Sequence, residues 1–192
     1  MEKIVLVGYG GHAKSVADCI ERSGKYEIFG YTDVAAASSP YRYLGNDDVL
    51  PAVFEQGVRN AALCIGYLGK GTLREVLYQR LKDIGFCLPV IQDPSAIVAQ
   101  SAELGEGVFV GKGAIINAEA VVGKMTIINT KALVEHECRV GAFTHVAVAA
   151  VLCGQVEVGE AALIGANATV LQGRTILPRQ IVPAGATFRK PE

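Results

Sequence analysis

Residues 132–165 read ALVEHECRVGAFTHVAVAAVLCGQVEVGEAALIG, with an aliphatic residue at every sixth position. Neither an α-helix nor an alternating β-strand repeats at six residues. In a hexapeptide β-helix, one aliphatic residue of each short strand stacks on its counterpart in the next coil. Three such strands make one coil, so fifteen hexads predict about five coils. The full column is Val98, Leu104, Val110, Ile116, Val122, Ile128, Val134, Val140, Val146, Leu152, Val158, Ile164, Val170, Ile176 and Val182.

A second column of small residues lies two positions before the first, from Ala96 to Ala168, and ends at Arg174 and Gln180. Positions i−2 and i share one face of a strand, so both columns should point inward. The residue after the aliphatic one is often Gly or Asn, and we expect positive φ angles there because these residues tolerate them. A sandwich of short strands is the alternative, but such strands do not keep register over fifteen units.

Composition narrows the function further. The chain has 192 residues and a net charge of −1, which gives no reason to expect binding to nucleic acid or to an acidic membrane surface. The N-terminus, MEKIVLVGYGG, is typical of a strand that enters a glycine loop and not of a signal peptide, and no apolar run is long enough to span a membrane. Five cysteines without a Cys-x-x-Cys pair indicate buried thiols in a reducing cytoplasm.

The first ninety residues follow a different pattern, in which predicted strands alternate with predicted helices. This alternation favours a small parallel sheet, so we expect an α/β nucleotide-binding domain at 1–92 and a β-helix at 93–192. The predicted strands are Lys3–Val7, Glu27–Tyr31, Ala61–Ile65 and Cys87–Ile91, and the predicted helices are Ala13–Ser23, Asp47–Gln56 and Thr72–Ile84.

The loop Gly8-x-Gly10-x-x-Ala13 fits the dinucleotide fingerprint, and Asp33 lies beyond the next strand. Glycines let backbone amides reach a phosphate at a helix N-terminus, and the acid can bind a ribose hydroxyl. Ninety residues supply only about half of a full dinucleotide fold, which favours a nucleotide or a nucleotide-sugar diphosphate over NAD. A tight turn without a ligand remains the alternative.

The chain has only three histidines, His12 in the glycine loop and His136 and His145 in the β-helix. His136 should lie at a corner beside Glu137, and a carboxylate next to an imidazole orients it and raises its basicity, as general-base catalysis needs. His145 directly precedes Val146, so its side chain should face outward from a strand, where subunits would meet.

Three stretches together resemble one family: Gly8–Lys14, Ile65-Gly66 and, above all, Val134–Val146. They are similar to the bacterial sugar acyltransferases related to sialic acid O-acetyltransferase and to UDP-4-amino-sugar N-acetyltransferases. The resemblance implies a nucleotide-binding α/β domain joined to a left-handed parallel β-helix. It also implies a homotrimer with active sites between subunits, acetyl transfer from acetyl-CoA to a sugar amine or hydroxyl, and a place in cell-surface polysaccharide biosynthesis.

The resemblance also implies roles for individual residues. His136 matches the proton acceptor, and Glu137 matches the residue that increases its basicity. Residues that match the acetyl-CoA site are His145 at the thioester, Gly154 with its amide at the oxyanion, and Ala166 and Ala184 along the CoA path. Those that match the nucleotide-sugar pocket are Gly10, Gly11, His12, Asp33 and Gly66.

Three departures from the family pattern put the acceptor sugar in question: Tyr67-Leu68 replaces a pair of Asn, Thr32-Asp33 replaces Asp-Asp, and Gly185–Glu192 ends early. We expect N-acetylation of a nucleotide-linked amino sugar by direct attack, without a metal or a covalent intermediate. O-acetylation of sialic acid or a related sugar and a non-enzymatic nucleotide-binding scaffold remain alternatives. A zinc lyase like the gamma-type carbonic anhydrases needs three histidines, and this β-helix has two. Cys138 falls in the inward column, which favours a packing thiol over a nucleophile.

Overall fold

The computed structural model describes residues 1–189, which form two compact units. One unit contains Met1–Gly66 and Gly71–Ile91, and the other contains Tyr67–Lys70 and the described chain from Gln92 onward. The sequence placed a single boundary after residue 92 and did not separate Tyr67–Lys70 from the first unit. Residues 190–192, which we had included in the second domain, lie outside the described part of the chain.

The first unit is a four-stranded parallel sheet in the order β3-β2-β1-β4. The inner strand β1 is apolar, and its residues from Ile4 to Val7 are fully buried, as is typical of a central strand in a parallel sheet whose two faces are covered. The elements are β1 Glu2–Val7, α1 Gly11–Ser23, β2 Tyr26–Thr32, β3 Tyr43–Gly45, η1 Asp47–Val49, α2 Leu50–Glu55, β4 Asn60–Leu63 and α3 Leu73–Ile84.

Two features of this sheet differ from the sequence prediction. Cys87–Ile91 is not a strand of it: only Cys87 pairs with Asn60, and Pro89 lacks the N–H that would continue the ladder. Strand β3 was not predicted. It approaches β2 closely because Gly30 has no Cβ, which would otherwise lie 2.6 Å from the carbonyl oxygen of Arg42.

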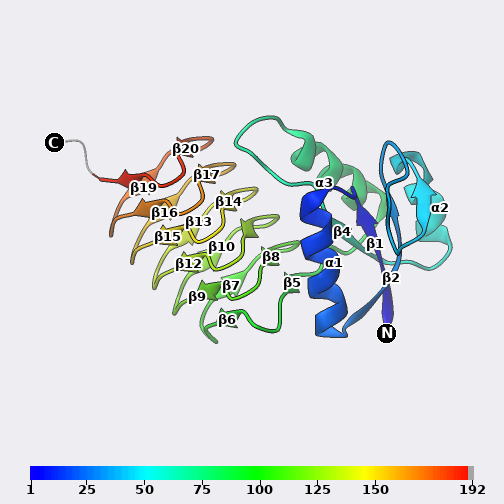
Figure 1. The fold of residues 1–192 in the computed structure, drawn as a ribbon, viewed down its shortest axis with the longest axis horizontal. Helices are drawn as coiled ribbons and strands as arrows, with labels where there is room; N and C mark the ends of the chain where they lie inside the picture. Colours follow the sequence, from blue (N-terminus) through cyan, green and yellow to red (C-terminus); the bar gives the residue numbers. More distant parts are fainter. Residues whose placement is uncertain (190–192) are drawn as a thin grey trace. The chain divides into compact units, whose positions relative to one another are not determined.

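The second unit is a parallel β-helix, which confirms the architecture predicted from the hexads. Its two-residue strands stack coil upon coil in three parallel sheets (Figure 1), ordered β19-β16-β13-β10-β7, β20-β17-β14-β11-β8-β5 and β21-β18-β15-β12-β9-β6. We call these the β7–β19, β5–β20 and β6–β21 sheets. The strands are β5 Ile91–Gln92, β6 Ile97–Val98, β7 Glu103–Leu104, β8 Phe109–Val110, β9 Ile115–Ile116, β10 Val121–Val122, β11 Ile127–Ile128, β12 Leu133–Val134, β13 Arg139–Val140, β14 His145–Val146, β15 Val151–Leu152, β16 Glu157–Val158, β17 Leu163–Ile164, β18 Thr169–Val170, β19 Thr175–Ile176, β20 Ile181–Val182 and β21 Thr187–Phe188.

The predicted aliphatic column forms the core of the β-helix. Its fifteen members are the second residues of β6 to β20, and from Val110 to Val182 none of them is more than 4% exposed. Val98 and Leu104 are only half-buried because they belong to the first strands of their sheets.

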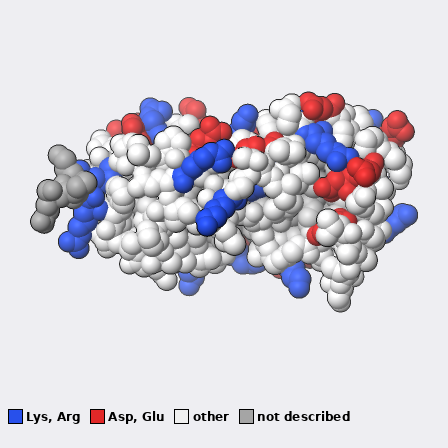
Figure 2. All heavy atoms as spheres, turned by 90° about the horizontal axis from the view of Figure 1, so that it is seen from above, with Lys and Arg blue, Asp and Glu red and all other residues white. Residues whose placement is uncertain are grey.

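None of the helices in residues 1–189 has the length and apolar character needed to cross a membrane. Lysines and arginines intermingle with acidic residues on the face seen in Figure 2.

The glycines that follow the aliphatic residues serve a purpose we did not predict. Their φ angles are not positive; a Cβ on any of Gly105, Gly111, Gly123, Gly141, Gly159 and Gly165 would instead lie 2.4–2.9 Å from a backbone nitrogen of the next coil. Positive φ falls two residues later, and ten non-glycine residues adopt it: Glu119, Met125, Lys131, Glu137, Phe143, Ala149, Gln155, Ala161, Asn167 and Arg179. At these six positions glycine thus lets the next coil approach closely, and the turn two residues later tolerates other residues.

Gly159→Ala should therefore destabilise the β-helix. The new Cβ would lie 2.4 Å from the backbone nitrogen of Pro178, so the coils must separate locally, at a cost of about 1–3 kcal/mol. Thermal or urea unfolding measures the change. Gly173→Ala is the comparison for backbone strain alone, since a Cβ there meets nothing within 4 Å and its φ of 63° costs about 1–2 kcal/mol. A Gly159→Ala protein as stable as wild type would contradict this explanation of the glycines.

Candidate active site

The side chains of His136 and Glu137 contact each other at the corner between β12 and β13. Nδ1 of His136 lies 3.0 Å from Oε2 of Glu137, and both side chains are 48% exposed. Glu137 has a left-handed φ of 59°, one of the repeated turn positions. A carboxylate only accepts, so Nδ1 carries the proton and donates it, and Nε2 of the neutral ring keeps its lone pair. The hexad register thus presents a histidine whose outer nitrogen can accept a proton.

Gly154 lies beside this ring in the next coil. A Cβ on Gly154 would lie 2.6 Å from both Cε1 and Nε2 of His136, so only glycine leaves room for the ring where it stands. At the equivalent turn positions, side chains accept from the backbone N–H: Asn117 Oδ1 from Ala118 at 2.9 Å, and Glu135 Oε2 from His136 at 3.2 Å. Among the described residues, no hydrogen bond engages the N–H of Gly154. This amide is therefore available next to the imidazole.

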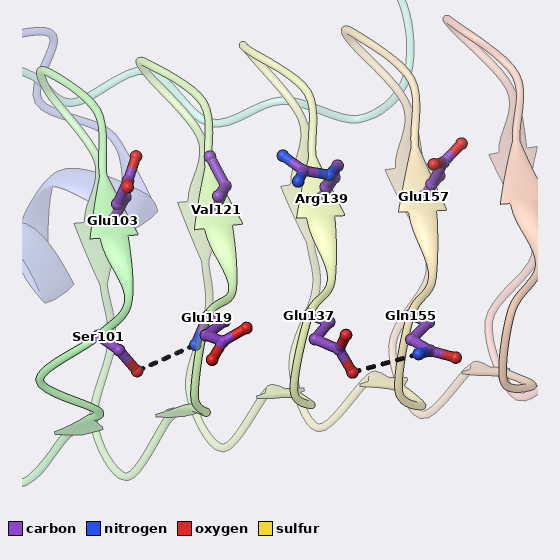
Figure 3. A pocket seen from close by; sticks show the side chains of 8 residues that line it. All are labelled: Ser101, Glu103, Glu119, Val121, Glu137, Arg139, Gln155 and Glu157. Carbon is purple, nitrogen blue, oxygen red and sulfur yellow. Dashed lines mark hydrogen bonds between the residues drawn. The ribbon is translucent and has the colours of Figure 1, made fainter.

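The β7–β19 sheet carries a shallow groove of about 580 Å³ beside Glu137 (Figure 3). In the groove, Gln155 Nε2 donates to Glu137 Oε2 at 3.2 Å, and Ser101 Oγ accepts from the Glu119 N–H at 3.1 Å. Four carboxylates and one guanidinium line it, so its charge is predominantly negative. The lining residues are Ser101, Glu103, Glu119, Val121, Glu137, Arg139, Gln155 and Glu157.

His145 has a different environment from His136. It faces away from the β-helix core, as predicted, but it is only 8% exposed because Tyr67 lies against it. Asn129 Oδ1 accepts from the Thr130 N–H at 2.8 Å, which turns the Asn129 amide nitrogen toward His145 Nε2 at 3.0 Å. Nε2 must therefore accept, and Nδ1 donates to the Tyr67 carbonyl at 2.7 Å. Both nitrogens of a neutral ring are thus engaged.

Tyr67 is in turn held on the β-helix by its hydroxyl, which donates to the carbonyl of Ala161 at 2.7 Å. The sequence pattern indicated no role for Tyr67, Asn129 or Gln155 in acyl transfer. Asn129 directly follows an aliphatic core residue, at a corner of the coil. An amide side chain at such a corner was a sequence signal for a polar contact with a neighbouring coil. The position of Tyr67 depends on the loop Tyr67–Lys70, which packs with the β-helix although it lies far from it in the sequence. No local sequence pattern predicts such a contact.

The structure separates the predicted β-helix residues into two groups at different corners and one residue, His145, on a sheet. His136, Glu137 and Gly154 lie at the corner between the β6–β21 and β7–β19 sheets. Ala166 and Ala184 lie in successive coils at the corner between the β5–β20 and β6–β21 sheets, where the Gly185 N–H donates to the Ala166 carbonyl at 2.8 Å. His145 lies on the β5–β20 sheet itself. Within one chain these residues do not form a single cluster.

The glycine loop brings the residues predicted in the first unit together. Helix α1 begins at Gly11, two residues earlier than expected, so His12 lies in its first turn, and its N-cap residue Gly10 supplies no side-chain cap. Gly66 packs beside His12, since a Cβ there would lie 3.7 Å from that of His12. Asp33 holds the loop in shape: its two carboxylate oxygens accept from the backbone N–H groups of Tyr9 at 2.7 Å and Val34 at 2.6 Å.

Cys138 is a packing residue in this structure. Its thiol is buried in the inward column and donates to the Cys153 carbonyl at 3.1 Å. Burial raises the pKa of Cys138, so the thiol stays protonated near neutral pH, which opposes a nucleophilic role. Within residues 1–189, no group of three or more His, Cys, Asp or Glu side chains could hold a metal ion.

Known proteins share this architecture along nearly the whole chain. The model of the PglD N-terminal domain matches residues 3–81. The crystal structure of PerB from Caulobacter crescentus, in complex with CoA and GDP-perosamine, has 39% identity and a TM-score of 0.93, covering 98% of this chain and 89% of PerB. This chain belongs to the sugar acyltransferases of the hexapeptide-repeat superfamily. The resemblance stated from the sequence is thereby confirmed.

Two further members of the sugar acyltransferase family are similar to the chain. A mutant of perosamine N-acetyltransferase from Caulobacter crescentus, in complex with CoA and GDP-perosamine, has 30% identity and a TM-score of 0.66, covering 97% of this chain and 93% of that one. The acetyltransferase domain of PglB from Neisseria gonorrhoeae, in complex with acetyl coenzyme A, has 26% identity and a TM-score of 0.88, covering 98% and 93%. As a member of this family, the chain is an acyltransferase.

Proposed function

We propose that this acyltransferase moves the acetyl group of acetyl-CoA onto the amine of a nucleotide-linked amino sugar, with His136 as general base. One observation carries the proposal: Nδ1 of His136 is held by Glu137, its Nε2 keeps a lone pair, and the Gly154 amide lies beside it. A base and an oxyanion donor in contact are what direct acyl transfer requires. No residue in this mechanism needs a metal or forms a covalent intermediate.

In the proposed reaction the sugar amine attacks the thioester carbonyl carbon while His136 Nε2 takes a proton from the nitrogen. The Gly154 N–H donates to the oxyanion that forms. The C–S bond then breaks, the carbonyl re-forms as an amide, and the imidazolium returns its proton to the departing CoA sulfur. A general base contributes about 10²–10⁴-fold and one oxyanion donor about 10²–10³-fold in such reactions.

His145 belongs in this scheme to acetyl-CoA binding and not to proton transfer. Its Nε2 already accepts from Asn129, and its Nδ1–H already donates to the Tyr67 carbonyl. We assign the CoA path to the same side of the β-helix, along Ala166 and Ala184, whose small side chains leave the corner between their coils accessible. The relatives crystallised with bound CoA or acetyl-CoA support acetyl-CoA as the donor of the acetyl group.

A homotrimer would unite the two separate groups. The β6–β21 sheet lies between the corner of His136 and the corner of Ala166, and its outward residues are uncharged. In cyclic threefold symmetry, one side of a subunit contacts the other side of the next, so this sheet would face the axis and each active site would combine both corners. Light scattering should give the mass of three chains, and a monomer mass would exclude the arrangement. The outward residues are Ile97, Ile115, Leu133, Val151, Thr169 and Thr187.

The acceptor and the compartment follow from other features. The uncapped N-terminus of α1 suits a diphosphate, and the relative crystallised with GDP-perosamine supports a nucleotide-linked amino sugar as acceptor. No disulfide joins the five cysteines, so we assign the reaction to the cytoplasm.

The proposed acceptor is tested by measuring CoA release from acetyl-CoA with a panel of nucleotide-linked amino sugars and free sialic acids. Turnover of sialic acids alone would favour O-acetylation, and turnover of none would favour the scaffold alternative.

His12→Ala and Asp33→Ala should raise the KM for the sugar nucleotide and leave the KM for acetyl-CoA unchanged. His12 lies in the first turn of α1 beside Gly66, and Asp33 shapes the loop through Tyr9, so both belong to the glycine loop. Loss of one charge-assisted hydrogen bond predicts a rise of about tenfold or more. Steady-state kinetics with each substrate varied in turn measures it. An equal rise in both KM values would contradict the division into two pockets.

A further inference from the structure

Gln155 makes two contacts with the proposed catalytic pair from the next coil. Its backbone N–H donates to the His136 carbonyl at 3.0 Å, and its side-chain Nε2 donates to Glu137 Oε2 at 3.2 Å. The same carboxylate oxygen accepts from His136 Nδ1 at 3.0 Å. Figure 3 shows Gln155 and Glu137 side by side at the edge of the groove, joined by this hydrogen bond. One oxygen thus receives two donors, one from His136 and one from Gln155.

The β-helix does not need this side chain for its own stability. The equivalent position of the next coil is Gly173, which has the same left-handed φ and no side chain. Earlier coils carry Glu119 and Ser101 at this position. The backbone bond from residue 155 to His136 belongs to the repeating coil pattern and would survive any substitution other than proline. What is specific to Gln155 is therefore its amide donor.

We propose that Gln155 is a positioning residue for the acyl transfer, acting through Glu137. The Glu137 side chain is half-exposed, so water competes for its carboxylate and several rotamers are open to it. The Gln155 donor favours the rotamer in which Oε2 faces His136 Nδ1, and Glu137 in turn holds the ring with Nε2 directed at the acceptor. The inference rests on the proposed base role of His136.

The test is a double-mutant cycle between Gln155 and Glu137. Gln155→Ala should lower kcat by about tenfold, with the KM for acetyl-CoA and the oligomeric mass unchanged. Gln155→Glu keeps the shape but replaces the donor by a second carboxylate, so it should be at least as slow. In the Glu137→Ala background, Gln155→Ala should change kcat by less than about twofold, because the residue it positions is gone. Gln100→Ala, an exposed Gln two coils before His136, should match wild type and is the control.

Two outcomes would overturn the inference. Gln155→Glu with wild-type kcat would show that the donor is not needed. A Gln155→Ala effect of equal size with and without Glu137 would show that the residue acts elsewhere. Both are distinguishable from failure of the proposed function, which would appear as a His136→Ala enzyme that keeps its activity.

Discussion

His136→Ala should lose about 10²–10⁴-fold in kcat, with the KM for acetyl-CoA and the oligomeric mass unchanged. The variant removes the imidazole nitrogen that takes the proton in the proposed reaction, and it leaves the coil backbone intact. Because the side chain is 48% exposed, no core packing is lost. The residual rate should come from the Gly154 amide and from substrate binding.

Two comparisons make this expectation specific. Glu137→Ala should lose less than His136→Ala, because Glu137 orients the ring through Nδ1 and takes no proton itself. His145→Gln should act mainly on the KM for acetyl-CoA, since both nitrogens of His145 are engaged by Tyr67 and Asn129. A His136→Ala enzyme that keeps more than about a tenth of wild-type kcat would remove this residue from the base role.

The β-helix could be predicted from the sequence because its pattern is local and repeated. One aliphatic residue per hexad fixes both the inward face and the register, and the structure places all fifteen in strands. The backbone conformation at the turns could not be predicted in the same way. Glycine after the aliphatic residue suggested positive φ, but Gly159 and its counterparts are required by the approach of the next coil, a contact between residues 18 or more positions apart.

The candidate site was predictable only where chemistry and local spacing coincide. His136 and Glu137 are neighbours in sequence, so their contact follows from the turn itself. The tautomer of His145 depends on Tyr67, 78 residues away, and on the Asn129 amide, whose orientation is set by Thr130. Without those partners, an outward histidine looked accessible. The first unit shows the same limit, since Pro89 ends a predicted strand that its apolar residues alone would have continued.

Gly154→Ala should lower kcat by about 10²-fold without lowering the thermal stability of the protein. The added Cβ would lie 2.6 Å from Cε1 and Nε2 of His136, closer than atoms in contact can approach. The φ of Gly154 is not left-handed, so alanine adopts this backbone without strain, and the atoms it meets belong to a half-exposed ring that can swing into solvent. The fold is spared, and the base is displaced from its position by an ångström or more, which costs about 10²-fold in rate.

Kinetics and unfolding of the same variants decide the point. Gly154→Ala should resemble wild type in its melting temperature, whereas Gly159→Ala, whose Cβ meets the backbone of Pro178, should not. In the His136→Ala background, Gly154→Ala should cost less than about threefold more in kcat, because the ring it displaces is absent. A full additional loss would instead mean that the substitution disturbs the Gly154 amide itself, and an unchanged kcat in the single variant would show that the ring position seen here is not the reactive one.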